Sequence, residues 1–192
     1  EIFKTYVDSK KIAYVGWRST DLYSSVDKEY DEFLLFGSND RFTNYQQIID
    51  AWEPHYPSLN IVNGSLFNFK KKQDNLNYLG KLTQTEFENL YNRCGIHLCL
   101  SSIESFSHTI NQCCLSKSIP LCINNGPMAE IISSEDCFTL KGKKKKITNL
   151  LGSKYDYNVS ELKELVEKVL KMSETTLETM GENNRKNALR NH

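Results

Sequence analysis

Short, uninterrupted apolar runs, separated by stretches with helical periodicity, constrain the fold of this chain more than any other feature. Strands that are continuously apolar, rather than alternating, are typical of a parallel sheet with both faces covered by helices. The runs therefore predict parallel strands. They occupy residues 12–15, 33–36, 59–62, 76–79, 96–100, 119–123 and 137–140.

The stretches between these runs carry the signals of amphipathic helices. Apolar residues recur at positions i, i+3, i+4 and i+7 from Tyr45, and again from Phe87, ahead of which Thr83 and Glu86 form a capping box. The alternation of strand and helix predicts a doubly wound α/β domain, with a mostly parallel sheet of about six strands and helices on both faces. Helices are expected to begin near Tyr45, Thr83, Phe106, Ser160 and Ser173, the last one being interrupted near Gly181.

Composition excludes several classes of protein. With 39% hydrophobic and 25% charged side chains, the 192 residues are in the range of globular domains rather than disordered chains. The 24 basic side chains equal the 24 acidic ones in number, so nucleic acid is not an expected partner. No apolar run is long enough for a transmembrane segment, and no signal peptide opens the sequence.

The six cysteines bear on the compartment of the protein. None forms a C-x-x-C pair and most lie in apolar runs, so we expect buried thiols in a reducing, cytoplasmic environment. The first residue is Glu1 rather than Met, which indicates a piece of a longer protein. A run of five lysines around Gly142, within residues 141–146, is interpreted as a solvated loop, with a phosphate or membrane contact as the alternative.

Two polar loops mark the expected ligand site. Ligands of open α/β sheets bind beyond the carboxyl ends of the strands, where the strand order reverses. With the common order 3-2-1-4-5-6, counted from the strand at 33–36, the loops at 37–44 and 101–107 flank that point. Each loop leads into a helix, and the free N–H groups at a helix N-terminus suit a diphosphate. The composition of the loops alone fits any nucleotide or none.

Residues 94–112 resemble the signature of retaining GT-B glycosyltransferases of the group 1, or family 4-like, class. In that family the fourth strand is followed by a pattern close to Pro-Ser-x-x-Glu-Gly-Phe-Gly, and this chain has Leu-Ser-Ser-Ile-Glu-Ser-Phe-Ser at 100–107. The segment Asn-Asn-Gly-Pro-Met-Ala-Glu at 124–130 and the tail at 172–185 are similar to later parts of the same domain. The resemblance covers nearly the whole chain and matches the carboxy-terminal, nucleotide-sugar-binding half of such enzymes.

The resemblance implies roles for individual residues. Glu104 matches the first signature glutamate, which contacts the hydroxyls of the donor sugar. The backbone at 106–108 is expected to bind the diphosphate at a helix N-terminus, while Gly37 and Ser38 approach the phosphates from the other loop. The implied site is catalytic Glu104 with donor-binding Gly37, Ser38, Arg41, Ser105, Phe106, Ser107, His108 and Gln112, and with no metal.

Three departures from the family pattern affect the expected activity. Gln112 stands where the family has a second glutamate that holds the ribose hydroxyls, and its amide carries no charge. Ser105 and Ser107 replace glycines whose missing Cβ lets the backbone approach the ligand. The basic pair expected after the first strand is absent, and Arg41 is the only cation nearby. Such a site stabilises charge on the departing diphosphate, so losing cations is expected to slow transfer.

The expected function is transfer of a sugar, of hexosyltransferase type, from a UDP- or GDP-linked donor, with retained anomeric configuration and without metal or cofactor. Residues 1–30 are expected to connect to an amino-terminal GT-B domain of the same longer protein. Residues 31–192 are expected to form the nucleotide-sugar-binding domain, closing with helices at 160–190. The acceptor, whether glycan, protein or lipid, is not identified by the sequence, and the chain alone is expected to be inactive without the acceptor domain.

Two alternatives stay open. The departures at Gln112 and the two serines, with the missing basic pair, suit a degenerate GT-B half that binds a nucleotide, a sugar or another protein without catalysis. A flavodoxin-like or receiver domain is the weaker alternative, because the acidic cluster that a receiver needs is missing. Asp-x-Asp, P-loop and G-x-G-x-x-G motifs are also absent. Of the histidines, His97 is expected in the core and His55 on the surface.

Overall fold

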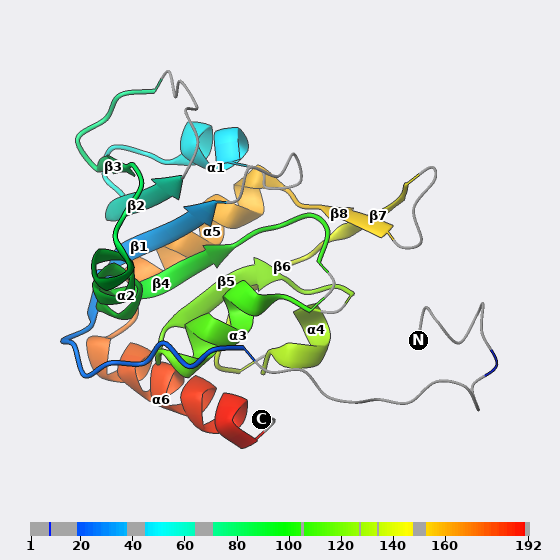
Figure 1. The fold of residues 1–192 in the computed structure, drawn as a ribbon. Coiled ribbons are helices and arrows are strands. Elements are labelled where there is room, and N and C mark those ends of the chain that lie inside the picture. Colours follow the sequence, from blue (N-terminus) through cyan, green and yellow to red (C-terminus); the bar gives the residue numbers. More distant parts are fainter. Residues whose placement is uncertain are drawn as a thin grey trace.

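A computed structural model describes residues 8, 19–37, 45–63, 71–104, 106–126, 128–133, 135–147 and 153–190 of the chain (Figure 1). The strand predicted at 12–15 lies outside these residues. The six other predicted strands are all present and form one sheet. They are β1 (Glu29–Gly37), β2 (Ser58–Asn63), β3 (Leu76–Leu79), β4 (Cys94–Cys99), β5 (Ile119–Ile123) and β6 (Phe138–Leu140).

The sheet has the order β3-β2-β1-β4-β5-β6, and every neighbouring pair is parallel. The predicted order 3-2-1-4-5-6 is therefore confirmed. Every residue of β4 and β5 is buried. Burial on both faces explains why these strands do not alternate between apolar and polar residues.

Helices cover both faces of the sheet, as predicted (Figure 1). They are α1 (Tyr45–Ala51), α2 (Gln84–Arg93), α3 (His108–Leu115), α4 (Met128–Ile131), α5 (Val159–Leu170) and α6 (Glu174–Arg190). α1 and α5 pack together on one face, where Phe33 meets Trp52 edge-on with 5.2 Å between the ring centroids. α2, α3 and α6 lie on the other face, where Leu34 packs with Leu90 and Tyr91. The core thus occupies both sides of the sheet.

The amino-terminal end of α2 is set by the predicted capping box. Thr83 Oγ1 accepts the Glu86 N–H at 3.3 Å, and Glu86 Oε2 accepts the Thr83 N–H at 2.8 Å. Each side chain therefore satisfies a backbone donor that the first turn leaves without a helical partner.

The predicted interruption of the last helix near Gly181 is wrong. α6 continues through that position without a break. A Cβ built on Gly181 would lie 2.2 Å from the carbonyl oxygen of Lys117. The glycine therefore permits close packing of α6 against the turn after α3, and it does not end the helix.

The lysine-rich segment forms a hairpin rather than the predicted loop. β7 (Lys143–Lys146) pairs antiparallel with β8 (Ser153–Asp156) as a separate two-stranded sheet. Asp156 reduces repulsion between the strands by pairing with Lys145 at 2.5 Å and with Lys154 at 3.2 Å. The hydrogen bond from Lys145 also lowers the pKa of the Asp156 carboxyl. All residues of β7 are exposed, so the predicted solvation of the lysines is confirmed.

All six cysteines are buried free thiols, as predicted. Burial raises the pKa of the Cys94 thiol to about 12, which keeps it protonated and unreactive near neutral pH. Within the described part of the chain, no helix has both the length and the apolar character needed to cross a membrane.

Candidate functional site

The carboxyl ends of β1 and β4 lie side by side, as the predicted site requires. In their parallel pairing Phe33 is level with Ile96, and Leu34 with His97. Continuing this register brings Gly37, the last residue of β1, level with Leu100. The loops at 37–44 and 101–107 therefore leave the sheet from adjacent strands and at the same edge (Figure 1).

The structure places five of the predicted donor-site residues in one continuous stretch of chain. Glu104, Phe106 and Ser107 lie between β4 and α3, His108 begins α3, and Gln112 follows one helical turn later. Gly37 ends the neighbouring strand. The predicted residues Ser38, Arg41 and Ser105 lie outside the described residues.

Ser107 holds a backbone conformation that favours glycine. It is the N-cap of α3, with φ 58° and ψ 62°, and it is only 3% exposed. An L-residue pays about 1–2 kcal/mol for this left-handed conformation. The resemblance expects a glycine here for space near the ligand, and the backbone angles add a second reason.

Replacing Ser107 by glycine is expected to stabilise the fold by about 0.5–1 kcal/mol. Relief of the left-handed strain outweighs the entropy that glycine adds to the unfolded chain. Urea unfolding of Ser107→Gly measures the effect. Ser102→Gly is the matched control, because Ser102 is buried nearby without a positive φ and should lose stability. A Ser107→Gly protein less stable than the wild type would contradict the strain at this position.

Asn111 supports the loop from inside α3, and the sequence did not single it out. Its Nδ2 donates to the carbonyl oxygens of Phe106 at 3.3 Å and Ser107 at 3.1 Å, and its backbone N–H also donates to Ser107. These bonds fix the loop carbonyls toward the helix. The first N–H groups of α3 have no partners within the helix, and so they can receive an anion. Asn111 is therefore a positioning residue.

The side chain of His108 is held by two neighbours. Its Nδ1 lies 3.0 Å from the Oγ of Ser19, which lies in the segment before β1. Its ring meets Phe106 at 4.8 Å between centroids, with the rings inclined by 66°. The first turn of α3 is thereby fixed relative to the segment that precedes β1.

The loop that carries Glu104 is fixed at two points. Ser101 Oγ donates to the Ile103 carbonyl oxygen at 2.8 Å, and the fully buried Ser102 accepts the Tyr155 N–H of β8, also at 2.8 Å. Glu104 itself is half-buried. A carboxylate on a fixed loop, partly open to solvent, can accept hydrogen bonds from sugar hydroxyls.

Phe36 adds an aromatic surface at the same edge. It is 40% exposed, near the carboxyl end of β1, and its ring lies 5.2 Å from that of Phe87 in α2. This exposure is not predicted from the sequence, since Phe36 belongs to a continuous apolar run. A flat ring at this position can stack on a nucleobase.

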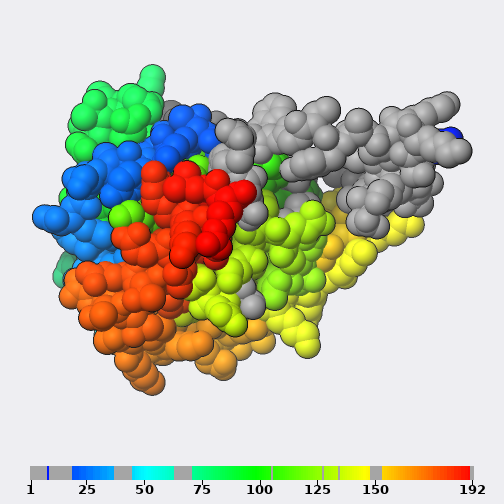
Figure 2. Space-filling view, turned by 90° about the horizontal axis from the view of Figure 1, so that it is seen from below, coloured from blue at the N-terminus to red at the C-terminus, as the bar shows by residue number. Residues whose placement is uncertain are grey.

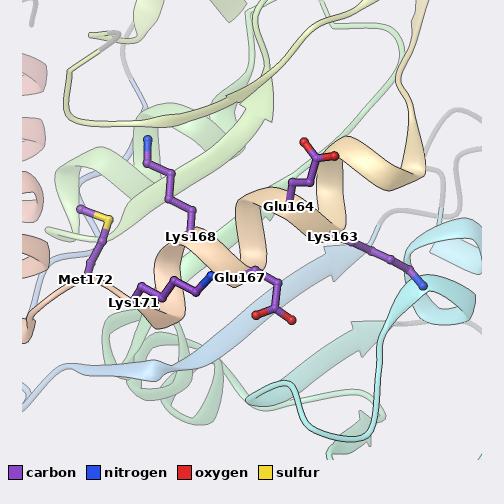
Figure 3. Close-up of a pocket in the computed structure, with 6 residues that line it drawn as sticks. All are labelled: Lys163, Glu164, Glu167, Lys168, Lys171 and Met172. Atoms are coloured by element: carbon purple, nitrogen blue, oxygen red, sulfur yellow. The ribbon is translucent and has the colours of Figure 1, made fainter.

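Two hollows on the described residues lie away from this edge. One, of about 580 Å³, lies along α5, and its lining side chains point in different directions rather than toward a common centre (Figure 3). The other, of about 560 Å³, includes Lys28 and Lys117, which precede β1 and β5 at the opposite edge of the sheet. Burial lowers the pKa of Lys28 to about 8, and its Nζ donates to Ser118 Oγ at 2.8 Å and to the Asn92 carbonyl. Lys28 thus has a structural role there.

Comparison with known proteins supports the fold through structure alone. No protein-family model matches the sequence, and no curated protein matches it. The fold is similar to the crystal structure of the C-terminal domain of a glycosyl transferase group 1 family protein (LpcC) from Francisella tularensis. The TM-score is 0.63 at 15% identity, covering 86% of this chain and 87% of that one.

Two larger proteins contain the same fold as a part. Anabaena Alr3699/HepE, in complex with UDP-glucose, gives a TM-score of 0.62 at 14% identity over 84% of this chain. TarM gives 0.67 at 11% identity over 92% of this chain. The chain spans 44% of HepE and 34% of TarM. The expected fold, that of the carboxy-terminal domain of GT-B glycosyltransferases, is confirmed.

Proposed function

We propose that this chain is the nucleotide-sugar-binding domain of a glycosyltransferase that uses a UDP- or GDP-linked donor without metal and retains the anomeric configuration. The observation that carries the proposal is the meeting of the β1 and β4 ends at one edge, with the Glu104 loop leading into the N-terminus of α3. The similar fold of HepE, determined in complex with UDP-glucose, supports the choice of ligand. The acceptor would be bound by a second domain of a longer protein.

Each residue at this edge has a separate role in donor binding or sugar transfer. The N–H groups and the positive dipole end of α3 stabilise the diphosphate, both as ligand and as leaving group. Glu104 accepts hydrogen bonds from the sugar hydroxyls and so orients the anomeric carbon. Phe36 stacks on the base, and Gln112 contacts the ribose as a neutral amide. Arg41 would supply the nearby cation.

Calorimetry with UDP, GDP and their sugar conjugates tests the proposal. One nucleotide sugar is expected to bind, and Glu104→Ala is expected to weaken that binding by about tenfold to a hundredfold, because a hydrogen bond to a charged group is lost. Glu164→Ala, at an exposed position of α5, is the matched control. In the full-length protein Glu104→Ala should also lose transfer. Unchanged binding and turnover in Glu104→Ala would remove this residue from the site.

A binding module without catalysis is the second candidate function. Gln112 favours it, since a half-buried neutral amide stands where the family carries a charged ribose ligand. Nucleotide binding without transfer in the full-length protein would support this candidate. A cytoplasmic location is also proposed, on the support of six buried free thiols.

A further inference from the structure

The hairpin of β7 and β8 concentrates positive charge. We call residues 141–147 and 153–156 the lysine hairpin; they contain six lysines and one aspartate, a formal charge of +5. The whole chain has no net charge, so all other residues together carry −5. No acidic residue occurs in this segment before Asp156. Lysines this dense repel one another, and a hairpin needs no such run to form.

The charges lie on both faces of the hairpin. The strand register places Lys143 opposite Asp156 and Lys145 opposite Lys154, and these four side chains share one face. Lys144 and Lys146 belong to the other face. The strands extend beyond β6, away from the main sheet, and the space-filling view shows them at the margin of the molecule (Figures 1 and 2). The lysines are thus presented outward rather than around a pocket.

The base of the lysine hairpin is firmly attached. Tyr155 donates its N–H to Ser102 at 2.8 Å, and Asn125 Nδ2 donates to the Gly142 carbonyl at 3.1 Å. A Cβ on Gly142 would lie 2.4 Å from that amide nitrogen, so a side chain here would displace the Asn125 amide. β7 and β8 are therefore attached to the domain by two hydrogen bonds at their base.

We propose that the lysine hairpin docks the protein on an anionic lipid bilayer. All its cations are lysines, which act as compact point charges and suit a diffuse layer of headgroups better than a bidentate phosphate site. An extended soluble polyanion lying across the domain would meet residues with a net charge of −5. A bilayer would contact only the lysine hairpin, so its anionic headgroups would not be repelled by the acidic remainder of the chain. The proposal does not depend on sugar transfer.

Sedimentation of the 192-residue chain with vesicles tests the docking. We expect binding to vesicles of phosphatidylcholine mixed with phosphatidylglycerol, and none to phosphatidylcholine alone. Changing Lys143, Lys144, Lys145 and Lys146 to glutamine should weaken binding by about a hundredfold or more, since each lysine near an anionic surface contributes about fivefold. Raising the ionic strength to about 1 M should release the protein, because the Debye length falls to about 3 Å.

Matched variants separate local charge from net charge. Glutamine at Lys72, Lys168, Lys171 and Lys186, which are exposed elsewhere, changes the net charge equally and should leave binding intact. Arginine at the four β7 positions should also preserve it. Equal loss in both glutamine variants, or a wild type that stays in the supernatant, would overturn the proposal. The proposal would also be overturned if the protein stayed bound to heparin at a salt concentration at which it dissociates from the vesicles. Nucleotide-sugar binding by the β7 variant should equal that of the wild type, which keeps this test separate from the proposed transfer.

Discussion

Acidifying the solution from about pH 7 to about pH 4 is expected to destabilise the fold by about 3 kcal/mol through one imidazole, that of His97. His97 lies in β4 and is 2% exposed, as the sequence predicted for a core histidine. Its Nε2 is 3.1 Å from the carbonyl oxygens of Tyr91 and Cys94, so this nitrogen carries the hydrogen of a neutral ring. Burial, assisted by the charge of Lys28, lowers the pKa of His97 from 6.5 to about 3.

The direction of the pH effect follows from where the proton binds. In the unfolded chain an imidazole binds a proton below about pH 6.5, whereas folded His97 binds one only below about pH 3. Between these values the unfolded state holds the additional proton, so stability falls as the pH falls. The loss begins well above the range in which the carboxyl groups titrate, and the two effects can be separated.

Urea unfolding over a series of pH values measures this effect. In His97→Gln the amide can still donate near the Nε2 position but cannot titrate, so stability should become nearly independent of pH between about 6.5 and 5. His55→Gln removes an imidazole whose side chain is 64% exposed, and it should keep the wild-type dependence. The same dependence in the wild type and in His97→Gln would show that another group is responsible.

Gly181→Ala is expected to destabilise the fold by about 3 kcal/mol, although alanine is the best helix former. At an exposed helical position the same change stabilises by about 1 kcal/mol. Here the new methyl group would lie 2.2 Å from the Lys117 carbonyl oxygen and 3.0 Å from the Tyr30 hydroxyl. The carbonyl belongs to the backbone and cannot rotate away as a side chain can. α6 would have to move away from α3 and β5, against which it packs.

Thermal and urea unfolding of Gly181→Ala measure this cost. Lys186→Ala, at an exposed position of the same helix, is the control and should change stability by less than about 0.5 kcal/mol. A Gly181→Ala protein as stable as the wild type would mean that α6 can shift without cost and that its close packing on the Lys117 carbonyl does not contribute to stability.

The sheet could be predicted from the sequence because the burial of each strand is visible in the apolar residues of that strand alone. Continuous apolar runs indicate burial on both faces, and the parallel order follows from their alternation with helices. The lysine hairpin could not be predicted, since β7 has no apolar alternation and forms on a root made by Ser102 and Asn125. The role of Gly181 could not be predicted, because the sequence does not distinguish a glycine that ends a helix from one that allows another segment to pack closely against it.

The candidate site was predictable only in part. The resemblance singled out Glu104 and the stretch that follows it, and the structure brings that stretch to the predicted edge. Asn111 was missed because its role depends on which carbonyls lie one helical turn before it. Phe36 was missed because exposure at the end of a strand depends on what packs beside it. Both features arise from tertiary geometry.

The root of β8 on Ser102 gives the projecting strands the geometry of a spacer. β7 has four residues, which at about 3.3 Å each make a ribbon roughly 13 Å long. The hydrogen bond to Ser102 attaches β8 two residues from Glu104. If the far end of the strands rested on the bilayer, that edge of the sheet would therefore be held at a nearly constant distance from the membrane surface. Substrates anchored in the membrane would then be selected by the distance between their lipid anchor and their reactive group, as well as by their chemistry.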